Sequence, residues 1–500
     1  MMRRSVVLAC LLLLLGTPLL HAGDDGLPAW ARAVAVPDDS DATRKAAVAR
    51  LRGVPGRPVC GDKSTASQVY GSTCASREYA APPLLEAPAF RWQVDYGWWA
   101  VWSPFLIDGK LLTGSCNNDT NRGLSALDMA TGKVRWRIGT VCDQGSRAGS
   151  MGRARFYELD ARTALFTLGR DDGKADDYYV VDVRAGRILR TLSPLKRGIW
   201  TWQDGVFTVI TRSTQDQETY LNGLDADLGK QLWRDSSFRI KCDKLDPHCE
   251  PVFSPGAGSD GMLYLSATAK DQPEPPTRQL HAFDARSGQL HWRHTGQPEF
   301  SLLHKPGYRS DDGAPLVAGG KVIIRLGSYL DAGHSGRAMA LRALDARTGD
   351  LVWTTEPVPL AQGFQKGLRL GNRIAVGDML VVKFQGEEGA HLFGYRLTDG
   401  RLMWRRSANP NAVLTASAGG VFYMAEMLRS DRDETLLLQG FDGQAGTLLW
   451  TARLPGHNVP FTSEWDIDAS PSILLQGPSW RIGRDGALYG VTMKGAYKLQ

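Results

Sequence analysis

One short motif recurs along the chain and constrains its fold more than any other feature. It places a glycine four residues after an aspartate and four residues before a tryptophan, as in Asp128, Gly132 and Trp136. Self-similarity of this kind predicts a structural unit used many times over. Four further copies are complete, namely Asp225, Gly229 and Trp233; Asp284, Gly288 and Trp292; Asp345, Gly349 and Trp353; and Asp442, Gly446 and Trp450. Two more have one substitution, namely Asp182, Gly186 and Arg190; and Arg396, Gly400 and Trp404.

Each copy predicts a β-hairpin. An apolar strand ends at the aspartate, the chain turns at the glycine, and a second strand carries the tryptophan. The glycine supplies the positive φ of a tight turn, and the aspartate accepts hydrogen bonds from turn amides. The tryptophan offers a large apolar area to a neighbouring sheet. A second turn precedes each hairpin, at Asp108-Gly109, Asp204-Gly205, Asp260-Gly261, Gly319-Gly320, Gly377-Asp378, Gly419-Gly420, Asp485-Gly486 and, in degenerate form, near Asp160.

Two turns per copy give four strands per unit, and the motif glycines follow one another at intervals of 43 to 61 residues. Four-stranded units at this period indicate a β-propeller. A strand around Trp92 has no partner hairpin, and the chain ends at Leu499-Gln500, where the next aspartate turn is due. We therefore expect an all-β, eight-bladed propeller of four-stranded antiparallel blades, with the N-terminal strand joining the C-terminal blade. Seven or nine blades would require one match to be accidental.

The frame Ala-Leu-Asp-x-x-Thr-Gly-x-x-x-Trp, as at residues 126–136, resembles the tryptophan-docking repeat of PQQ-like β-propellers. That superfamily includes quinoprotein alcohol dehydrogenases and the outer-membrane assembly protein BamB. The resemblance covers residues 88–500 and implies the fold. It does not imply an activity, because enzymes and non-enzymes share the repeat.

The N-terminus predicts export. Residues 1–22 contain Arg3 and Arg4, an apolar run over 6–15 and Ala22 at a cleavage site, which is the order of a secretory signal peptide. The run is too short to span a bilayer, and Cys10 follows too few apolar residues for a lipoprotein signal. No later stretch is apolar enough for a transmembrane segment. The mature protein is therefore expected in the periplasm or outside the cell.

Residues 23–87 form an N-terminal extension, which either packs on the propeller of residues 88–500 or is a partly mobile arm. Ser40 or Asp41 can cap a short helix over 42–52, with Gly53 just beyond it. Residues 54–83 are predicted to be a loop held by a disulfide. The extension is too small for a core of its own.

The composition bears on nucleic-acid binding and on the oxidation state of the cysteines. The full chain has 59 basic residues, and removal of the signal peptide takes away Arg3 and Arg4. The mature chain then has 57 basic and 53 acidic residues, a net charge of about +4 that does not predict nucleic-acid binding. Six cysteines remain, and an even count in an exported chain favours disulfides. The chain contains no Cys-x-x-Cys, as in a haem or zinc-ribbon motif. The predicted pairs are Cys60–Cys74, Cys116–Cys142 and Cys242–Cys249.

The two ends of the blades differ in their connections. Both glycine turns lie at one end. At the other end, the stretch from the tryptophan position to the next turn varies from 14 residues (Arg190 to Asp204) to 35 (Trp450 to Asp485). Long connections on a rigid scaffold commonly carry function, although they can also be tolerated insertions. Candidate binding residues on this face, which can equally be isolated solvated side chains, are His304, Arg309, Asp311, Asp312, His334, Arg337, His457, Glu464 and Asp466.

The preferred function is a non-catalytic scaffold that binds an envelope protein or a small ligand, as BamB does in outer-membrane assembly. The resemblance also implies an alternative, a quinoprotein oxidoreductase of alcohols or sugars with pyrroloquinoline quinone (PQQ) and calcium. Such enzymes commonly have a Cys-Cys pair against the quinone, and this sequence has no such dipeptide. No catalytic motif is matched, so no catalytic, cofactor-binding or metal-binding residue is assigned. A third possibility is recognition of an envelope glycan by the aromatic stretch 96–102.

Overall fold

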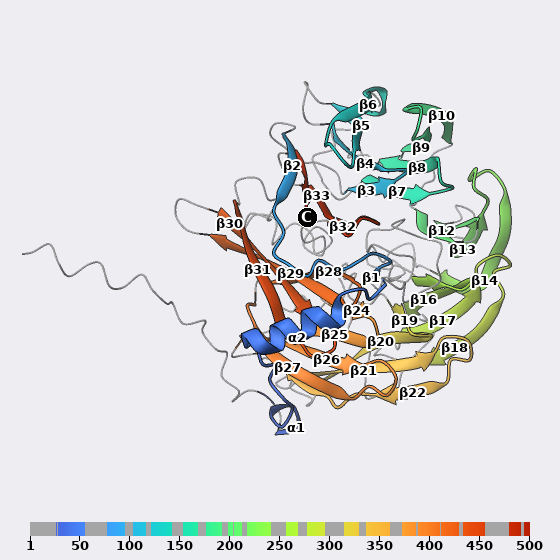
Figure 1. Cartoon of the computed structure of the whole chain (residues 1–500). Coiled ribbons are helices and arrows are strands. Elements are labelled where there is room, and N and C mark those ends of the chain that lie inside the picture. The colour runs from blue at the N-terminus through green and yellow to red at the C-terminus, as the bar shows by residue number, and fades with distance from the viewer. Residues whose placement is uncertain are drawn as a thin grey trace, which may run out of the picture.

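The described residues form an all-β ring of eight antiparallel sheets, each built on four strands, arranged as an eight-bladed propeller (Figure 1). This confirms the predicted fold class. The structure is a computed structural model, and it describes residues 27, 29–55, 78–95, 104–116, 122–142, 154–168, 177–192, 199–203, 205–212, 218–241, 257–268, 278–295, 315–329, 337–360, 373–386, 389–410, 412–429, 434–455, 480–491 and 495–500.

The first four blades each consist of four consecutive strands, taken from the innermost to the outermost. Blade 1 is β3 (Phe105–Ile107), β4 (Lys110–Ser115), β5 (Gly123–Asp128) and β6 (Val134–Ile138); blade 2 is β7 (Ala154–Glu158), β8 (Thr163–Leu168), β9 (Asp177–Asp182) and β10 (Arg187–Leu192); blade 3 is β11 (Ile199–Gln203), β12 (Val206–Arg212), β13 (Glu218–Leu224) and β14 (Gln231–Lys241); blade 4 is β15 (Ala257–Ser259), β16 (Met262–Thr268), β17 (Arg278–Asp284) and β18 (Leu290–Thr295).

The other four blades include two added strands and one taken from the N-terminal side. Blade 5 carries an extra strand, β23, that pairs with β21; β1 extends blade 7; and β2 completes blade 8. Blade 5 is β19 (Leu316–Ala318), β20 (Lys321–Tyr329), β21 (Arg337–Asp345), β22 (Leu351–Thr354) and β23 (Val358–Leu360); blade 6 is β24 (Arg373–Val376), β25 (Met379–Gly386), β26 (Gly389–Arg396) and β27 (Leu402–Ala408); blade 7 is β1 (Glu78–Tyr79), β28 (Val413–Ala418), β29 (Val421–Arg429), β30 (Glu434–Asp442) and β31 (Leu448–Pro455); blade 8 is β32 (Arg481–Ile482), β33 (Leu488–Val491), β34 (Gly495–Leu499) and β2 (Phe90–Asp95).

The strand β2 pairs antiparallel with β34, so that Trp92 lies opposite Lys498. Blade 8 is thus assembled from segments about 400 residues apart in sequence, since β2 ends at Asp95 and β34 begins at Gly495. The aromatic stretch 96–102 that follows β2 lies outside the described residues.

The core of the ring lies between neighbouring blades. Inner strands such as β3, β19 and β24 are buried along their whole length, whereas the rim strands β6 and β10 are largely exposed. One apolar cluster, for example, joins Val381 of blade 6 to Phe422 of blade 7. Because both faces of a blade pack against neighbours, its inner strands are nearly continuous apolar runs.

The tryptophans of the motif, with the exception of Trp450, dock onto the following blade. The Nε1–H of Trp353, for example, donates a hydrogen bond to the carbonyl of Leu397 at 2.8 Å. The same indole packs on the turn of Gly400, where a Cβ atom would lie 2.6 Å from its Cδ2. The bond satisfies a buried donor, and the stacked glycine leaves room for the ring. Equivalent bonds run from Trp92 to Met129, Trp136 to Val183, Trp233 to Ala285, Trp292 to Ala346 and Trp404 to Gly443, at 2.8–3.2 Å.

The motif aspartate holds the turn, as predicted. In blade 5, Oδ1 of Asp345 accepts hydrogen bonds from the backbone N–H groups of Arg347 at 2.9 Å and Thr348 at 3.0 Å. These bonds hold the pKa of Asp345 below its ordinary value, and the bond from Thr348 has the larger effect. The turn glycine Gly349 has φ +76°, which fits the predicted positive φ.

The motif glycines of blades 4 and 7 have a second role that the sequence analysis did not assign to them. Gly288 (φ +69°) and Gly446 (φ +71°) have the predicted positive φ, and each also lies flat against an indole of the preceding blade. A Cβ atom on Gly288 would lie 2.5 Å from Cδ2 of Trp233, and one on Gly446 would lie 2.6 Å from Cδ2 of Trp404. Glycine is therefore required here for close packing as well as for backbone conformation.

One copy departs from the expected geometry. In blade 3 the positive φ belongs to Leu228 (φ 54°) and not to Gly229, so the prediction that this glycine supplies it is wrong. The preceding blade has Arg190 in place of a tryptophan, and Arg190 pairs with Asp227 at 2.5 Å. Without an indole to accommodate, the turn does not need its glycine in the stacked position, and it adopts a different shape.

The N-terminal extension packs on blades 6 and 7. Ser40 caps α2 (Asp41–Leu51) by accepting a hydrogen bond from Thr43 N, within a residue of the predicted helix, and Gly53 beyond it has φ +84°. A shorter helix, α1 (Ala29–Arg32), and the strand β1 were not predicted, and the prediction that residues 54–83 are entirely loop is wrong at β1. Neither described helix is long and apolar enough to cross a membrane.

Two glycines with similar backbone angles provide a test of docking. Gly349 (φ +76°) stacks on Trp292, whereas a Cβ at Gly320 (φ +70°), in the other turn of the same blade, would meet nothing within 4 Å. Gly320→Ala should cost only the left-handed strain, about 1–2 kcal/mol. Gly349→Ala should add an overpacking cost of about 1–3 kcal/mol. Urea denaturation checks this, and equal losses would contradict docking as the main role of Gly349.

Candidate functional site

The long-connection face is the end of the ring at which the second strand of each blade connects to the third and the fourth to the next blade. Of the candidate binding residues, only Arg337 lies within the described part of the chain. It begins β21, where its backbone pairs with Tyr329 and Leu360. The remaining candidates, His304, Arg309, Asp311, Asp312, His334, His457, Glu464 and Asp466, lie outside the described residues.

A disulfide links two connections of blade 1 on this face. Cys116 follows β4, Cys142 ends a 3-10 turn after β6, and their sulfur atoms are bonded, which confirms this predicted pair. Arg122 donates from its guanidinium to the Cys142 carbonyl. Cys142 is fully buried, so the link is inside the blade and not on its surface. Both connections are therefore anchored at their bases. The other predicted pairs, Cys60–Cys74 and Cys242–Cys249, lie outside the described residues.

The innermost strands of the blades surround the ring axis, so their charged residues determine which ligands the described part of the axis can bind. At the long-connection end, blades 6 and 8 begin with two nearly buried cations, Arg373 and Arg481. Arg373 donates to the carbonyl of Ile323 in blade 5 at 3.4 Å. Among the described innermost strands β3, β7, β11, β15, β19, β24, β28 and β32, together with β1 on the axis side of β28, the carboxylates are Glu158 and Glu78, and both lie at the opposite end, next to a short turn.

The described ends of the inner strands do not by themselves supply the ligands of a calcium-bound PQQ. Calcium takes six to eight oxygen ligands, carboxylates prominent among them. The described residues contain no group of three or more His, Cys, Asp or Glu side chains that could hold a metal ion. The disulfide joins cysteines 26 residues apart, unlike the adjacent pair of the quinoprotein pattern.

The extension reaches the inner edge of blade 7. β1 pairs in parallel with β28, with Glu78 opposite Ser417, on the side of β28 that faces the ring axis (Figure 1). Oε1 of Glu78 accepts a hydrogen bond from Gly377 N at 2.9 Å. Burial raises the pKa of Glu78 to about 8, against the effect of that bond. The carboxyl group is therefore largely protonated at pH 7.

Sequence reasoning missed Glu78, Arg373 and Arg481 as buried polar groups near the axis. A charge at the first position of an otherwise apolar inner strand, as in the stretch 373–376, was an available signal for the arginines. Glu78 had none, because its burial depends on a strand pairing more than 300 residues away along the chain.

The fold and its docking turns define the class of protein, an eight-bladed propeller of PQQ-like repeats. The family model described as "Outer membrane protein assembly factor BamB" matches residues 217–419 and 341–466, together half of the chain. The chain belongs to this family of PQQ-like β-propellers.

Individual relatives are distant. The dehydrogenase subunit of an alcohol dehydrogenase (quinone) from Gluconobacter oxydans (strain 621H) is 33% identical over 141 residues, which is 28% of this chain and only 17% of that relative. BamB from Moraxella catarrhalis is 13% identical with a TM-score of 0.42, covering 82% of this chain and 99% of that one. Quinohemoprotein alcohol dehydrogenase from Comamonas testosteroni is 12% identical with a TM-score of 0.47, covering 92% and 83%.

Loss of the disulfide should loosen the long-connection face. The bond closes a loop of 26 residues, for which chain entropy predicts about 3.5 kcal/mol of stabilisation. A Cys116→Ser/Cys142→Ser variant should melt at lower temperature and be cleaved faster by protease in the segments next to residues 116 and 142. Mass mapping of early cleavage sites checks this. Cleavage spread evenly around the ring would contradict a local role.

The buried carboxyl of β1 predicts a pH dependence. Unfolded Glu78 loses its proton near its ordinary pKa of 4.5 and folded Glu78 near 8, so the folded state holds the extra proton between these values. Its contribution to stability is therefore lost as pH rises through this window. Glu78→Gln, which stays neutral, should gain thermal stability relative to wild type between pH 5 and 8. The exposed Glu86→Gln is the control. A difference between Glu78→Gln and wild type that stays constant with pH would refute this assignment.

Proposed function

We propose that this protein is a non-catalytic scaffold of the cell envelope that binds an envelope protein or a small ligand through its long-connection face. The role is similar to that of the outer membrane assembly factor for which the matching family model is described. The observation that carries the proposal is the chemistry of the inner strands: at the long-connection end, their described residues offer cations and apolar groups but no carboxylate.

The anchored connections of blade 1 support a binding role. A loop that is ordered before binding loses less conformational entropy when a partner docks. The Cys116–Cys142 bond and the Arg122 hydrogen bond supply such order at the bases of two neighbouring connections. Export by the signal peptide over residues 1–22 would place this face in the periplasm or outside the cell.

The alternative is a PQQ-dependent oxidoreductase of alcohols or sugars. It is favoured by the 33% identity to the quinone-dependent alcohol dehydrogenase subunit. The catalytic carboxylate and calcium ligands would then have to come from residues outside the described part of the chain, such as Asp311, Asp312, Glu464 and Asp466. No catalytic step is assigned to any of them.

Removal of two aspartates from the long-connection face should weaken partner binding, whereas removal of two aspartates from the short turns should not. We expect Asp311→Ala/Asp312→Ala to reduce capture of a barrel-assembly component from envelope extract by about tenfold, equivalent to 1.4 kcal/mol. The control Asp350→Ala/Asp378→Ala removes two exposed charges from the short turns of blades 5 and 6. Quantitative mass spectrometry of the captured proteins is the measurement. Equal capture by both variants would refute the assignment of the partner surface.

Cofactor titration separates the scaffold from the enzyme. The full chain is mixed with PQQ and calcium, and absorbance and dye reduction with alcohols and sugars are followed. We expect no saturable quinone binding and no turnover. Saturable binding together with turnover would replace the scaffold proposal with the oxidoreductase.

A further inference from the structure

The junction between blades 7 and 8 is built differently from the others with a docked tryptophan. At a regular junction, the indole N–H donates to the carbonyl of the residue just after the motif aspartate position, as from Trp404 to Gly443. At the 7–8 junction, Trp450 donates instead to the carbonyl of Leu84, at 2.8 Å. Leu84 lies in the N-terminal extension, outside the repeats.

The hydrogen bonds at the ends of blade 8 explain why a substitute is needed. In blade 1, Asp128 N donates to Lys133 O, and residues 129–132 form the turn between them. In blade 8, the corresponding partners are Gln500 and Ala89, whose N–H and carbonyl groups bond reciprocally at 3.1 and 3.2 Å. These two residues flank the position that the turn occupies in blade 1.

We propose that residues 78–88, here called the strap, serve as the docking turn of blade 8 and thereby close the ring between blades 7 and 8. The extension is then an integral part of the propeller, and closure depends on a segment outside the repeats.

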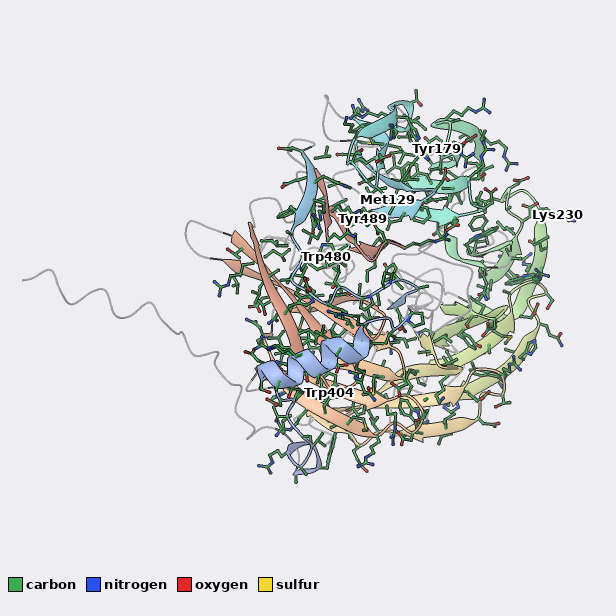
Figure 2. All side chains as sticks on the ribbon, in the orientation of Figure 1. Met129, Tyr179, Lys230, Trp404, Trp480 and Tyr489 are labelled. Carbon is green, nitrogen blue, oxygen red and sulfur yellow. A yellow bond between two sulfur atoms is a disulfide. The ribbon has the colours of Figure 1, made fainter. Side chains whose placement is uncertain are left out.

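The strap supplies the carbonyl acceptor of a docking turn and adds a second hydrogen bond to blade 7. Its carbonyl at Leu84 receives the Trp450 indole, and its N–H at Leu84 donates to the Tyr423 hydroxyl at 2.8 Å. Tyr423 and Trp450 both belong to blade 7, and their rings lie 6.0 Å apart. At the regular blade 8–1 junction the tyrosine at the equivalent position, Tyr489, instead donates its hydroxyl to the docking carbonyl of Met129 at 3.4 Å (Figure 2).

Two glycines accommodate the strap. A Cβ atom on Gly486, in the first turn of blade 8, would lie 2.8 Å from the carbonyl oxygen of Pro82. A Cβ on Gly419, in the first turn of blade 7, would lie 2.4 Å from Cδ of Pro83. The two prolines have no N–H to satisfy and a fixed φ, which suits a segment laid across two turns.

The strap also ties three blades together. β1 adds to β28 of blade 7, Glu78 accepts from Gly377 of blade 6, and the Tyr79 hydroxyl donates to the Trp480 carbonyl of blade 8 at 3.4 Å. Upstream of it, Arg50 of α2 pairs with the nearly buried Asp442 of the blade 7 turn. Displacing the strap should therefore weaken the 7–8 junction before any other.

The first test compares equivalent glycines in two blades. Gly486→Ala places a methyl group against the strap, whereas Gly109→Ala makes the same change at φ +68° in blade 1, where nothing lies within 4 Å. In the full chain, Gly486→Ala should speed amide hydrogen exchange in β28–β34 by about tenfold relative to Gly109→Ala, since exchange reports local opening. Equal exchange in the two variants would overturn the proposal.

A second variant keeps the test informative if Gly486→Ala does not fold. Tyr423→Phe leaves the Leu84 N–H without its acceptor and should also speed exchange in blades 7 and 8. Tyr395→Phe is the control, since the buried Tyr395 hydroxyl has no hydrogen-bond partner among the described residues. Faster exchange that is spread over all blades, or equal in the two variants, would show that Tyr423 acts on general packing and would refute the strap.

Coupling to the tryptophan gives an independent readout. If the strap is the docking turn of Trp450, Trp450→Phe and Gly486→Ala damage the same contact, and their effects on exchange should be less than additive. Trp450→Phe with Gly109→Ala should be additive, because the sites share no partner. Additivity in both pairs would contradict a shared contact.

Discussion

The ring depends on one contact, an indole that stacks on the turn of the next blade and donates its N–H to a carbonyl there. A buried indole N–H without a partner would cost about 1–3 kcal/mol, so the carbonyl is as necessary as the apolar area. The contact also requires space, which glycine at the turn and a small residue opposite the tryptophan provide. Ala343 lies opposite Trp353 and Gly394 opposite Trp404. One local device thus links neighbouring sheets that would otherwise share only apolar side chains.

This contact explains how much of the fold was predictable. The spacing of aspartate, glycine and tryptophan is local, so the hairpins, the blade count and the docking role followed from the sequence. The small residue opposite the tryptophan of each motif hairpin was a further signal: at that position blade 2, which has Arg190, has Val180 instead. The left-handed conformation of Leu228 was not predictable from the motif, because the shape of its turn depends on the preceding blade, which has no tryptophan at the docking position.

The functional site was predictable only in part, for a related reason. Cys116 and Cys142 could be paired because the repeat places both on one end of the same blade. Glu78 and Leu84 act through contacts with residues 417 and 450, and no local pattern encodes pairings at such separations. The order of strands and turns places the candidates of the long connections on the same face of the ring. It does not determine which of their side chains are in contact.

The division of the ring into two unlike faces bears on function more than the family does. The short turns at one end of the ring bind the docked tryptophans, and α2 and the strap of the N-terminal extension pack on that same end. The connections whose lengths differ from blade to blade therefore lie on the long-connection face, away from the docking turns. Scaffold and oxidoreductase would then differ in a few side chains at the inner ends of the strands, where calcium chemistry needs carboxylates. In this chain the described positions there include the buried Arg373 and Arg481, whose charge opposes cation binding.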